Sequence, residues 1–406
     1  MPVALIVSLT LGLLYARTIA PDLTWANFSA DGGDFLAAIA TGGVPHPGGY
    51  PFYLVLGGLF QRFPFGEPAF RTNLLSAIAT ILTANLVALM TSNWLAGGRW
   101  RQWLAVIAGL AYGLAPFVWG QALVTEVYAL HALLVSLCLF VHPKARQALV
   151  GLCFGIAAAN HLAALLVLPL LVLGGEEHWW VGPRELGKRF LGLLAGLSLY
   201  LLLPLRAAAH PVINWGDASS LEGFAWLVSG RLYSGYLFAT PLPDMLQRLR
   251  GLGSLLLEQY GAVGVFLAAW GLVGMSHGRE RFRAASLWIV LVFGAFAIQY
   301  GTADSQVYMA PVWPVMAVWI ALGLGSLLDL FGSRGWAQGI LVAGALLLVL
   351  LRLPRTIQQV DLSRDASATI WITQTLDAIP DRALVFVAGD RQVFALWYAQ
   401  FAKKRR

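Results

Sequence analysis

Residues 339–353 read GILVAGALLLVLLRL, a run in which Arg352 is the only charged residue. A helix needs about 20 mainly apolar residues to cross ~30 Å of hydrocarbon, and fewer when its flanks reach the interface. Similar runs recur along the 406-residue chain, which is 58% hydrophobic. Only 12% of its residues are charged, against about 25% in soluble domains. The sequence therefore predicts an all-α polytopic membrane protein.

The predicted transmembrane helices include the very start of the chain. No Lys or Arg precedes Arg17 and no small-residue cleavage site follows, so we interpret the first run as a retained helix and not as a signal peptide. We expect spanning helices near residues 1–20, 72–95, 103–119, 128–141, 190–204, 252–275, 284–301, 308–330 and 339–353.

Clusters of Lys and Arg between these runs orient the chain, because such clusters favour the cytoplasmic side. They predict that the N-terminus is cytoplasmic. Lys144 and Arg184 are both cytoplasmic if residues 147–174 form a hairpin of two short helices with Asn160 and His161 at its tip. A single tilted helix with a topology exception is the alternative. The hairpin gives about eleven crossings of the cytoplasmic (inner) membrane and an extracytoplasmic C-terminus.

Three polar stretches then face outward, at residues 21–71, 206–250 and 354–406. The first two are outer loops of a transmembrane module, residues 1–353, and the third is a C-terminal extracytoplasmic segment. This segment has a helical pattern at 366–378, an apolar strand at 383–388 and a second helical run through Tyr398. We expect a small α/β fragment that is too short for a core of its own.

Several functional classes are disfavoured. Cys138 and Cys153 both lie in apolar runs, so we expect neither a disulfide framework nor a zinc site. The net charge of +7 comes from clusters between apolar runs, which membrane topology explains better than nucleic-acid binding. No phosphate-binding loop, dinucleotide fingerprint, serine-hydrolase elbow or zinc-protease motif occurs. A transferase of this kind would need a donor that arrives through the membrane.

The first outer stretch carries the most suggestive residues, Asp31-Gly-Gly-Asp34-Phe35 and His46-Pro-Gly-Gly-Tyr-Pro51. Ionisable groups beside a bilayer are costly and often functional. Asp31 and Asp34 are three residues apart and would share one face of a helix. They could supply a general base for a hydroxyl, or Asp31 could simply cap the helix. His46 lies in a turn, where a solvated side chain is the alternative to a site residue.

Other candidates lie in the remaining outer loops. Arg206 and Arg231 offer planar donors that suit phosphate, although a helix-end cation and a solvated loop charge are the alternatives. Trp215 and Tyr233 are aromatic platforms for a sugar, or residues of the interfacial belt. Further polar candidates, each with helix capping or local hydrogen bonding as its alternative, are Glu126, Asn160, His161, Asp217 and Asp304.

Together these residues resemble a family of multipass membrane proteins, long catalogued as a domain of unknown function, whose vertebrate member is a protein O-mannosyltransferase. The two motifs of the first outer stretch look like the family's, with Asp34 where Glu is usual and Gly48 in place of a proline. The other similar motifs are Trp119-Gly-Gln121, Glu126-Val-Tyr128, Asn160-His161, Leu203-Pro-Leu-Arg206, Asn214-Trp-Gly-Asp217, Asp304-x-x-Val-Tyr308, Gly389-Asp390 and Trp397-Tyr398.

The resemblance implies a GT-C glycosyltransferase that transfers a sugar, with mannose favoured, from a polyprenyl phosphate to a hydroxyl of a protein or glycan. It implies inversion at the anomeric carbon and chemistry on the extracytoplasmic side. It places the base at Asp31, with Asp34 second. We expect no cofactor and no metal. The expected substrate-binding residues are His46, Tyr50, Gln121, Glu126, Asn160, His161, Arg206, Trp215, Asp217, Arg231, Tyr233, Asp304 and Tyr308.

Two other functions share the need for a polar cavity at the membrane. A transporter or flippase would move a lipid-linked sugar without forming a glycosidic bond. A non-catalytic protein would bind the sugar lipid and turn over nothing. Release of free polyprenyl phosphate separates both from a transferase.

Overall fold

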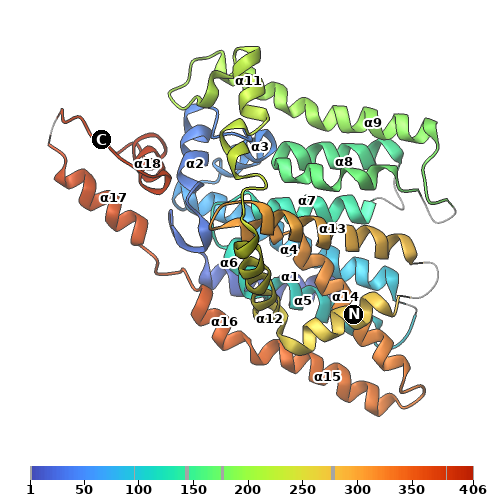
Figure 1. Ribbon diagram of the computed structural model, residues 1–406. Coiled ribbons are helices and arrows are strands. Elements are labelled where there is room, and N and C mark those ends of the chain that lie inside the picture. Colours follow the sequence, from blue (N-terminus) through green and yellow to red (C-terminus); the bar gives the residue numbers. More distant parts are fainter. Residues whose placement is uncertain are drawn as a thin grey trace.

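The computed structural model describes residues 2–95, 97–141, 146–174, 178–275, 279–380 and 382–405. Lys144, which the topology prediction used, lies outside them. Within the described residues the chain is almost entirely helical, and long helices run side by side in one bundle (Figure 1). The C-terminal helices α17 and α18 lie at the edge of this bundle (Figure 1). The predicted all-α architecture is confirmed.

Among the described residues, six helices are long and apolar enough to span a membrane. They are α4 (Pro68–Trp94), α9 to α10 (Pro183–Ala207), α12 (Leu242–Val273), α13 (Glu280–Gln299), α14 (Val312–Asp329) and α15 to α16 (Gly335–Val360). Helices α5 (Arg101–Gly113) and α6 (Pro116–Ala122) meet at a bend of 68°, and they form a further span if the bent pair is counted as one. Pro116 explains the bend, because a proline forces the residue before it out of the helical conformation.

Shorter apolar helices occupy the other predicted segments, namely α1 (Val3–Thr18), α7 (Tyr128–Val141) and α8 (Gln147–Asn160). Every segment predicted to span is therefore helical. The chain is a multi-pass membrane protein, and the number of eleven crossings stays a prediction.

The region after residue 146 has the hairpin arrangement. Helix α8 ends at an extended residue, His161, and is followed by the 3-10 helix η2 (Leu162–Val172). Arg189 shows that the open ends of the two arms lie together. Its Nε donates to Gln147 Oε1 (2.6 Å) at the start of α8, and its guanidinium also donates to the carbonyl oxygen of Leu173 (2.7 Å), just after η2. The tip at His161 is therefore the far end of the hairpin.

Glycines hold α8 directly against α9 (Pro183–Leu197). A Cβ atom on Gly151 would lie 1.7 Å from the carbonyl oxygen of Arg189, and one on Gly192 would lie 1.9 Å from that of Ala148. Gly155 and Gly196, one turn further along each helix, are also close to the opposite backbone, at 2.3 and 2.6 Å. Small residues four apart allow this backbone contact between helices in a membrane.

The three predicted outer stretches meet at one end of the bundle. The first contains α2 (Gly32–Thr41) and α3 (Pro51–Phe60), and the second contains α11 (Leu221–Val228). A short backbone bridge joins the first two stretches: the Val44 amide donates to Ile213 (2.9 Å), and the Trp215 amide donates back to Val44 (3.2 Å).

The C-terminal stretch folds back onto α2 through α18 (Asp390–Trp397) and the π-helical turn η7 (Tyr398–Ala402). Helix α17 (Ser367–Ala378) and α18 confirm the two predicted helical runs. The strand predicted at 383–388 is wrong, because these residues form no regular secondary structure, with Leu384 and Phe386 82% and 89% exposed. A strand is stabilised by hydrogen bonds to a neighbouring strand, and the described residues provide none.

Candidate active site

Asp34 is a buried carboxylate held by three donors. It lies in the first turn of α2 and is 0% exposed. Its Oδ2 accepts from the backbone amide (2.9 Å) and Nδ1 (2.7 Å) of His46, and its Oδ1 accepts from Trp215 Nε1 (3.2 Å). Asp34 thereby joins the first and second outer stretches and fixes the imidazole ring. Both of its oxygens are therefore already occupied by hydrogen bonds within the protein.

His46 lies between two carboxylates and is 3% exposed, so it is not a solvated turn residue. Its Nε2 is 3.1 Å from the hydroxyl of Tyr50 and 3.7 Å from Oδ2 of Asp31. Burial alone would lower the pKa of His46, but the charges of Asp31 and Asp34 outweigh burial and raise this pKa. The charged imidazolium is therefore favoured between the two acids.

Asp31 is the carboxylate that an incoming molecule can reach. Its side chain is 36% exposed, and it makes no capping hydrogen bond to the start of α2. Burial raises the pKa of Asp31, the charges of Asp34, Asp304 and Asp390 raise it further, and His46 opposes this shift. A raised pKa brings a carboxylate closer to the range in which a general base works. The capping interpretation finds no support in this geometry.

Glu126 lies behind Asp31 and is 1% exposed. Neither of its oxygens makes a hydrogen bond of good geometry, although the backbone amides of Asp31 and Val127 favour its charged form. Burial raises the pKa of Glu126 well above its ordinary value, and the charge of Asp31 adds to this shift. An unpartnered buried carboxyl is costly, so Glu126 is suited to a water or a polar substrate group.

The hairpin tip reaches the same region. Asn160 is fully buried, its amide donates weakly to the Val127 carbonyl (3.5 Å), and its oxygen has no partner. The ring of His161 lies 5.8 Å from Tyr50 and 5.7 Å from Tyr128. The α8–η2 hairpin therefore supplies two of the predicted residues from within the bundle.

Two further aromatic residues lie beside the histidines of the site. Tyr233, in the second outer stretch, is 6.3 Å from His46, and Tyr308 is 5.7 Å from His161. Asp304 precedes Tyr308 in a loop, and its charge acts on both Asp31 and Glu126. The predicted sequence positions from three distant parts of the chain thus converge on Asp31 and His46.

Two predicted residues brace the loops around the site. Gln121 Nε2 donates to the carbonyl oxygen of Asn27 (2.6 Å) and ties α6 to the first outer stretch. The half-buried Arg206, in α10 (Leu202–Ala207), donates to the carbonyl oxygen of Gly43 (3.1 Å). It ties the end of that helix to the turn before His46.

Two other predicted residues lie at the surface. Asp217 is exposed and accepts hydrogen bonds from Asn214 (3.2 Å) and Ser219 (2.7 Å) within its own loop. Those hydrogen bonds lower the pKa of Asp217. Arg231 is exposed at the start of the 3-10 helix η5 (Arg231–Tyr236). The structure brings neither residue into contact with the acidic pair.

The prediction missed the contribution of α18. The ring of Phe394 stacks on His46 at 6.3 Å with planes 18° apart, and the Asp390 charge acts on Asp31 and His46. A Cβ atom on Gly33 would lie 2.2 Å from the Phe394 carbonyl oxygen, so a glycine is needed for this approach. The signal available in the sequence was the Gly389-Asp390 motif, to which no role was assigned.

Asp22 anchors the C-terminal stretch to the bundle. Its carboxylate accepts from Lys403 Nζ (2.6 Å) and from the hydroxyl of Tyr398, both in the last ten residues of the chain. Lys403 also pairs with Glu67 (3.1 Å). Asp22, Lys403 and Tyr398 are all largely buried. Polar contacts that sequence patterns do not reveal therefore hold α18 over the site.

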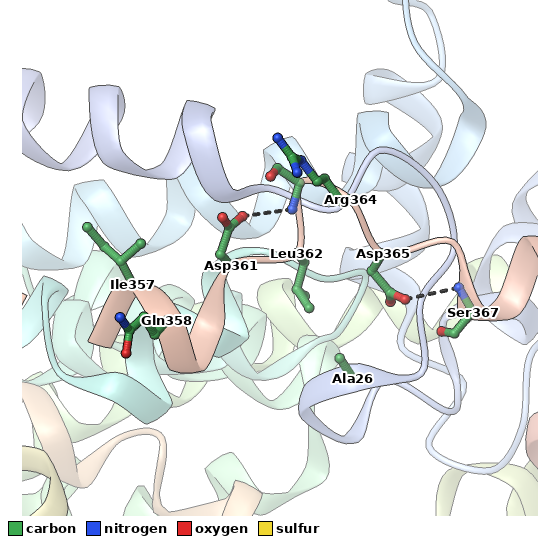
Figure 2. Close-up of a pocket in the computed structure, with 9 residues that line it drawn as sticks. Ala26, Ile357, Gln358, Asp361, Leu362, Arg364, Asp365 and Ser367 are labelled. Carbon is green, nitrogen blue, oxygen red and sulfur yellow. Dashed lines mark hydrogen bonds between the residues drawn. The ribbon is translucent and has the colours of Figure 1, made fainter. Parts of the chain in front are cut away.

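A hollow of about 770 Å³ lies where the chain leaves α16 (Leu353–Val360), and Figure 2 shows its lining residues. The carboxylates of Asp361 and Asp365 point to the backbone amides of Ser363 (2.9 Å) and Ser367 (3.0 Å) (Figure 2). These acids therefore stabilise turns. No three His, Cys, Asp or Glu side chains of the described residues are grouped as a metal site.

Comparison with known proteins finds relatives of the first part of the chain. Residues 31–174 match the family model for the N-terminal domain of the protein O-mannosyl-transferase TMEM260. Relatives include TMEM260 of Mus musculus, 26% identical over 214 residues, and that of Dictyostelium discoideum, 24% identical over 245 residues. The matches cover 48% and 52% of this chain but only 29% and 28% of those proteins.

Solved structures identify the fold. ArnT from Cupriavidus metallidurans bound to undecaprenyl phosphate is similar over 97% of this chain and 84% of its own, with a TM-score of 0.62 and 14% identity. The Archaeoglobus fulgidus oligosaccharyltransferase in its apo form is similar over 98% of this chain and 60% of its own, with a TM-score of 0.55 and 15% identity. The chain therefore shares the fold of these two solved proteins, and its residues 31–174 are similar to the N-terminal domain of the TMEM260 O-mannosyl-transferases, as the sequence motifs indicated.

Proposed function

We propose that this chain is a membrane glycosyltransferase that moves a sugar, with mannose favoured, from a polyprenyl phosphate to a hydroxyl group. The fold of the sugar transferases and the match to the O-mannosyl-transferases support this assignment. The single observation that supports it most is the arrangement of three side chains in the first outer stretch. One reachable carboxylate, Asp31, stands beside a buried Asp34–His46 pair that fixes its surroundings.

The proposed reaction is a single displacement at the anomeric carbon. Asp31 takes the proton of the acceptor hydroxyl, whose oxygen forms the new bond to C1. The bond between C1 and the phosphate oxygen breaks, and polyprenyl phosphate leaves with the electron pair. Attack opposite the leaving group inverts the configuration at C1.

His46 and Asp34 act on this step by electrostatics and position. The imidazolium lies 3.7 Å from Asp31, where it moderates the repulsion from the other acids. Because Asp34 is buried and bonded to the ring, the imidazole does not need to reorganise during the reaction. The unpartnered groups of Glu126 and Asn160 are available for sugar hydroxyls.

The leaving phosphate requires cations in a medium of low dielectric constant. Arg206 and Arg231 are the residues we assign to it, on the fork-like geometry of guanidinium groups. Arg206 is held near His46 by its bond to Gly43. Arg231 is exposed and would turn inward when the donor binds.

We place the reaction on the extracytoplasmic side of the cytoplasmic membrane, with a protein Ser or Thr or a glycan as acceptor. The positive-inside distribution of Lys and Arg supports this sidedness. The activity for which the relatives are named, protein O-mannosyl transfer, supports a protein acceptor.

The test is to incubate the purified chain with polyprenyl-phosphate mannose and an acceptor, and to measure released polyprenyl phosphate and the transferred sugar. We expect Asp31→Asn to lower the rate about 10²- to 10⁴-fold, the usual contribution of a general base. Asp377→Asn, an exposed carboxylate on α17, is the matched control and should keep the wild-type rate. Full activity in Asp31→Asn would refute the assignment of the base.

The same assay separates the other two functions. A transporter would move the labelled donor across a vesicle bilayer and release no polyprenyl phosphate. A binding protein would retain the donor without release or movement. Either result with wild-type protein would refute the proposed transferase.

A further inference from the structure

A second cavity, of about 710 Å³, lies between helices α5, α12, α14 and α15. All four helices belong to candidate membrane spans. The wall is built from aliphatic side chains and glycines, such as Leu267, Ile320 and Leu348. None of the proposed active-site residues lines this cavity. It therefore needs an explanation of its own.

Its wall indicates what fills it. Apolar cavities stay free of water, and an empty space of this size forfeits packing energy. Helix α15 is the least enclosed of the spans, with 11% of its most apolar window buried, so the cavity lies beside a helix largely open to lipid. A hydrocarbon chain from the bilayer is the molecule whose chemistry matches this lining.

One end of the cavity is polar. Helix α12 is broken at Gly261, whose φ of +68° interrupts the hydrogen-bond ladder. Arg352 donates to the carbonyl groups of Gln259 (2.7 Å) and Glu258 near this break. Gln259 is 2% exposed; its Oε1 accepts from the amide of Phe117 (2.8 Å), while its Nε2 has no partner. An unpaired buried donor at the end of an apolar cavity points to an acceptor on a ligand.

The charge at this end is positive. Arg355 lies three residues beyond Arg352 and is exposed. The carboxylate of Glu258, whose backbone carbonyl accepts from Arg352, is already bonded to Gln359 Nε2 (2.6 Å). Basic residues at a membrane surface attract anionic head groups.

We propose that this cavity binds one acyl chain of an anionic glycerophospholipid, whose phosphate is held by Arg352 and Arg355. Gln259 Nε2 donates to an oxygen of the same head group. The bound lipid fastens α15 and α16 to the rest of the bundle. Helix α16 leads into the stretch that carries Asp390 and Phe394 to the active site, so the lipid supports that site from a distance. The lipid site does not depend on the proposed transferase activity.

The test uses the full chain in nanodiscs of phosphatidylglycerol and phosphatidylcholine, followed by mild extraction and mass spectrometry of the lipid retained per chain. A Cβ atom on Gly344 meets no other atom within 4 Å, so Gly344→Phe is compatible with the backbone and places a ring in the space proposed for the acyl chain. We expect wild type to retain one phosphatidylglycerol and Gly344→Phe to retain about fivefold less or none. Gly12→Phe is the matched control, because Gly12 of α1 is equally open but lies outside the cavity.

A second variant tests the head group. Arg355→Gln removes an exposed charge without touching the cavity wall, and should lower the preference for phosphatidylglycerol over phosphatidylcholine about fivefold. Equal lipid retention by wild type and Gly344→Phe would overturn the proposal. So would retention of polyprenyl phosphate, added as a competitor, in place of the phospholipid.

Discussion

Replacing each of the two acids of the first outer stretch by asparagine should affect the stability of the fold differently. Asp34→Asn replaces a buried carboxylate that accepts from two donors of His46 and one of Trp215. The amide offers one acceptor and one donor, so at least one donor of the buried group loses its partner. Asp31→Asn instead removes a partly exposed charge whose surroundings disfavour it, as its raised pKa indicates.

The magnitude follows from burial. Removing one partner of a buried ion pair costs about 3–5 kcal/mol, because the other charge is left without compensation. Asp34 is 0% exposed, and His46 is 3% exposed, so solvent cannot replace the lost contact. We expect Asp34→Asn to lower the free energy of unfolding by about 3 kcal/mol, the low end of that range, because the imidazole can release its proton. For a chain of this length the melting temperature should fall by roughly 3–4 °C.

Asp31→Asn should leave the melting temperature unchanged or raise it, since repulsion from Asp34, Asp304 and Asp390 disappears. Both variants should lose transferase activity, the first by disorder of the site and the second by loss of the base. The assay is thermal unfolding of purified protein in detergent, with the released polyprenyl phosphate measured in parallel. A stable Asp34→Asn variant, or an Asp31→Asn variant destabilised as much as Asp34→Asn, would refute the division of roles.

Three further predictions concern other parts of the molecule. Gly192→Ala should lower stability by about 1–3 kcal/mol, because the new methyl group would lie 1.9 Å from a carbonyl oxygen of α8; unchanged thermal unfolding would contradict this contact. Activity should be lost as the pH falls through the raised pKa of Asp31, above the ordinary Asp value of about 3.9. The imidazolium of His46 should persist above the ordinary histidine pKa of about 6.5, so activity should fall again only at a higher pH. A kcat/KM profile whose acid or alkaline limb lies at the ordinary pKa value of the residue would refute this. Lys403→Met should leave the carboxylate of Asp22 without its cation and loosen residues 389–402, which hydrogen exchange would detect; unchanged protection there would contradict the proposed anchor.

The sequence determined the membrane class and the helices, because long apolar runs have no other use in a chain with so few charges. The motif Asp31-Gly-Gly-Asp34-Phe35 also pointed to the candidate site, since acids are scarce and costly beside a bilayer. The strand expected at 383–388 was wrong because the prediction used only the local pattern of residues. Local pattern shows that a segment suits a strand, but pairing requires a second strand, which no local pattern supplies.

Only the tertiary structure distinguishes the surroundings of the two acids. Sequence spacing treats Asp31 and Asp34 alike, whereas folding buries Asp34 against His46 and Trp215 and leaves Asp31 36% exposed. The burial of Asp34 depends on what the distant second outer stretch places over it, and it determines which of the two carboxylates a substrate can reach. The contact of Phe394 with His46 likewise joins residues almost 350 positions apart. Local spacing cannot encode such contacts, because they arise only when separate elements pack together.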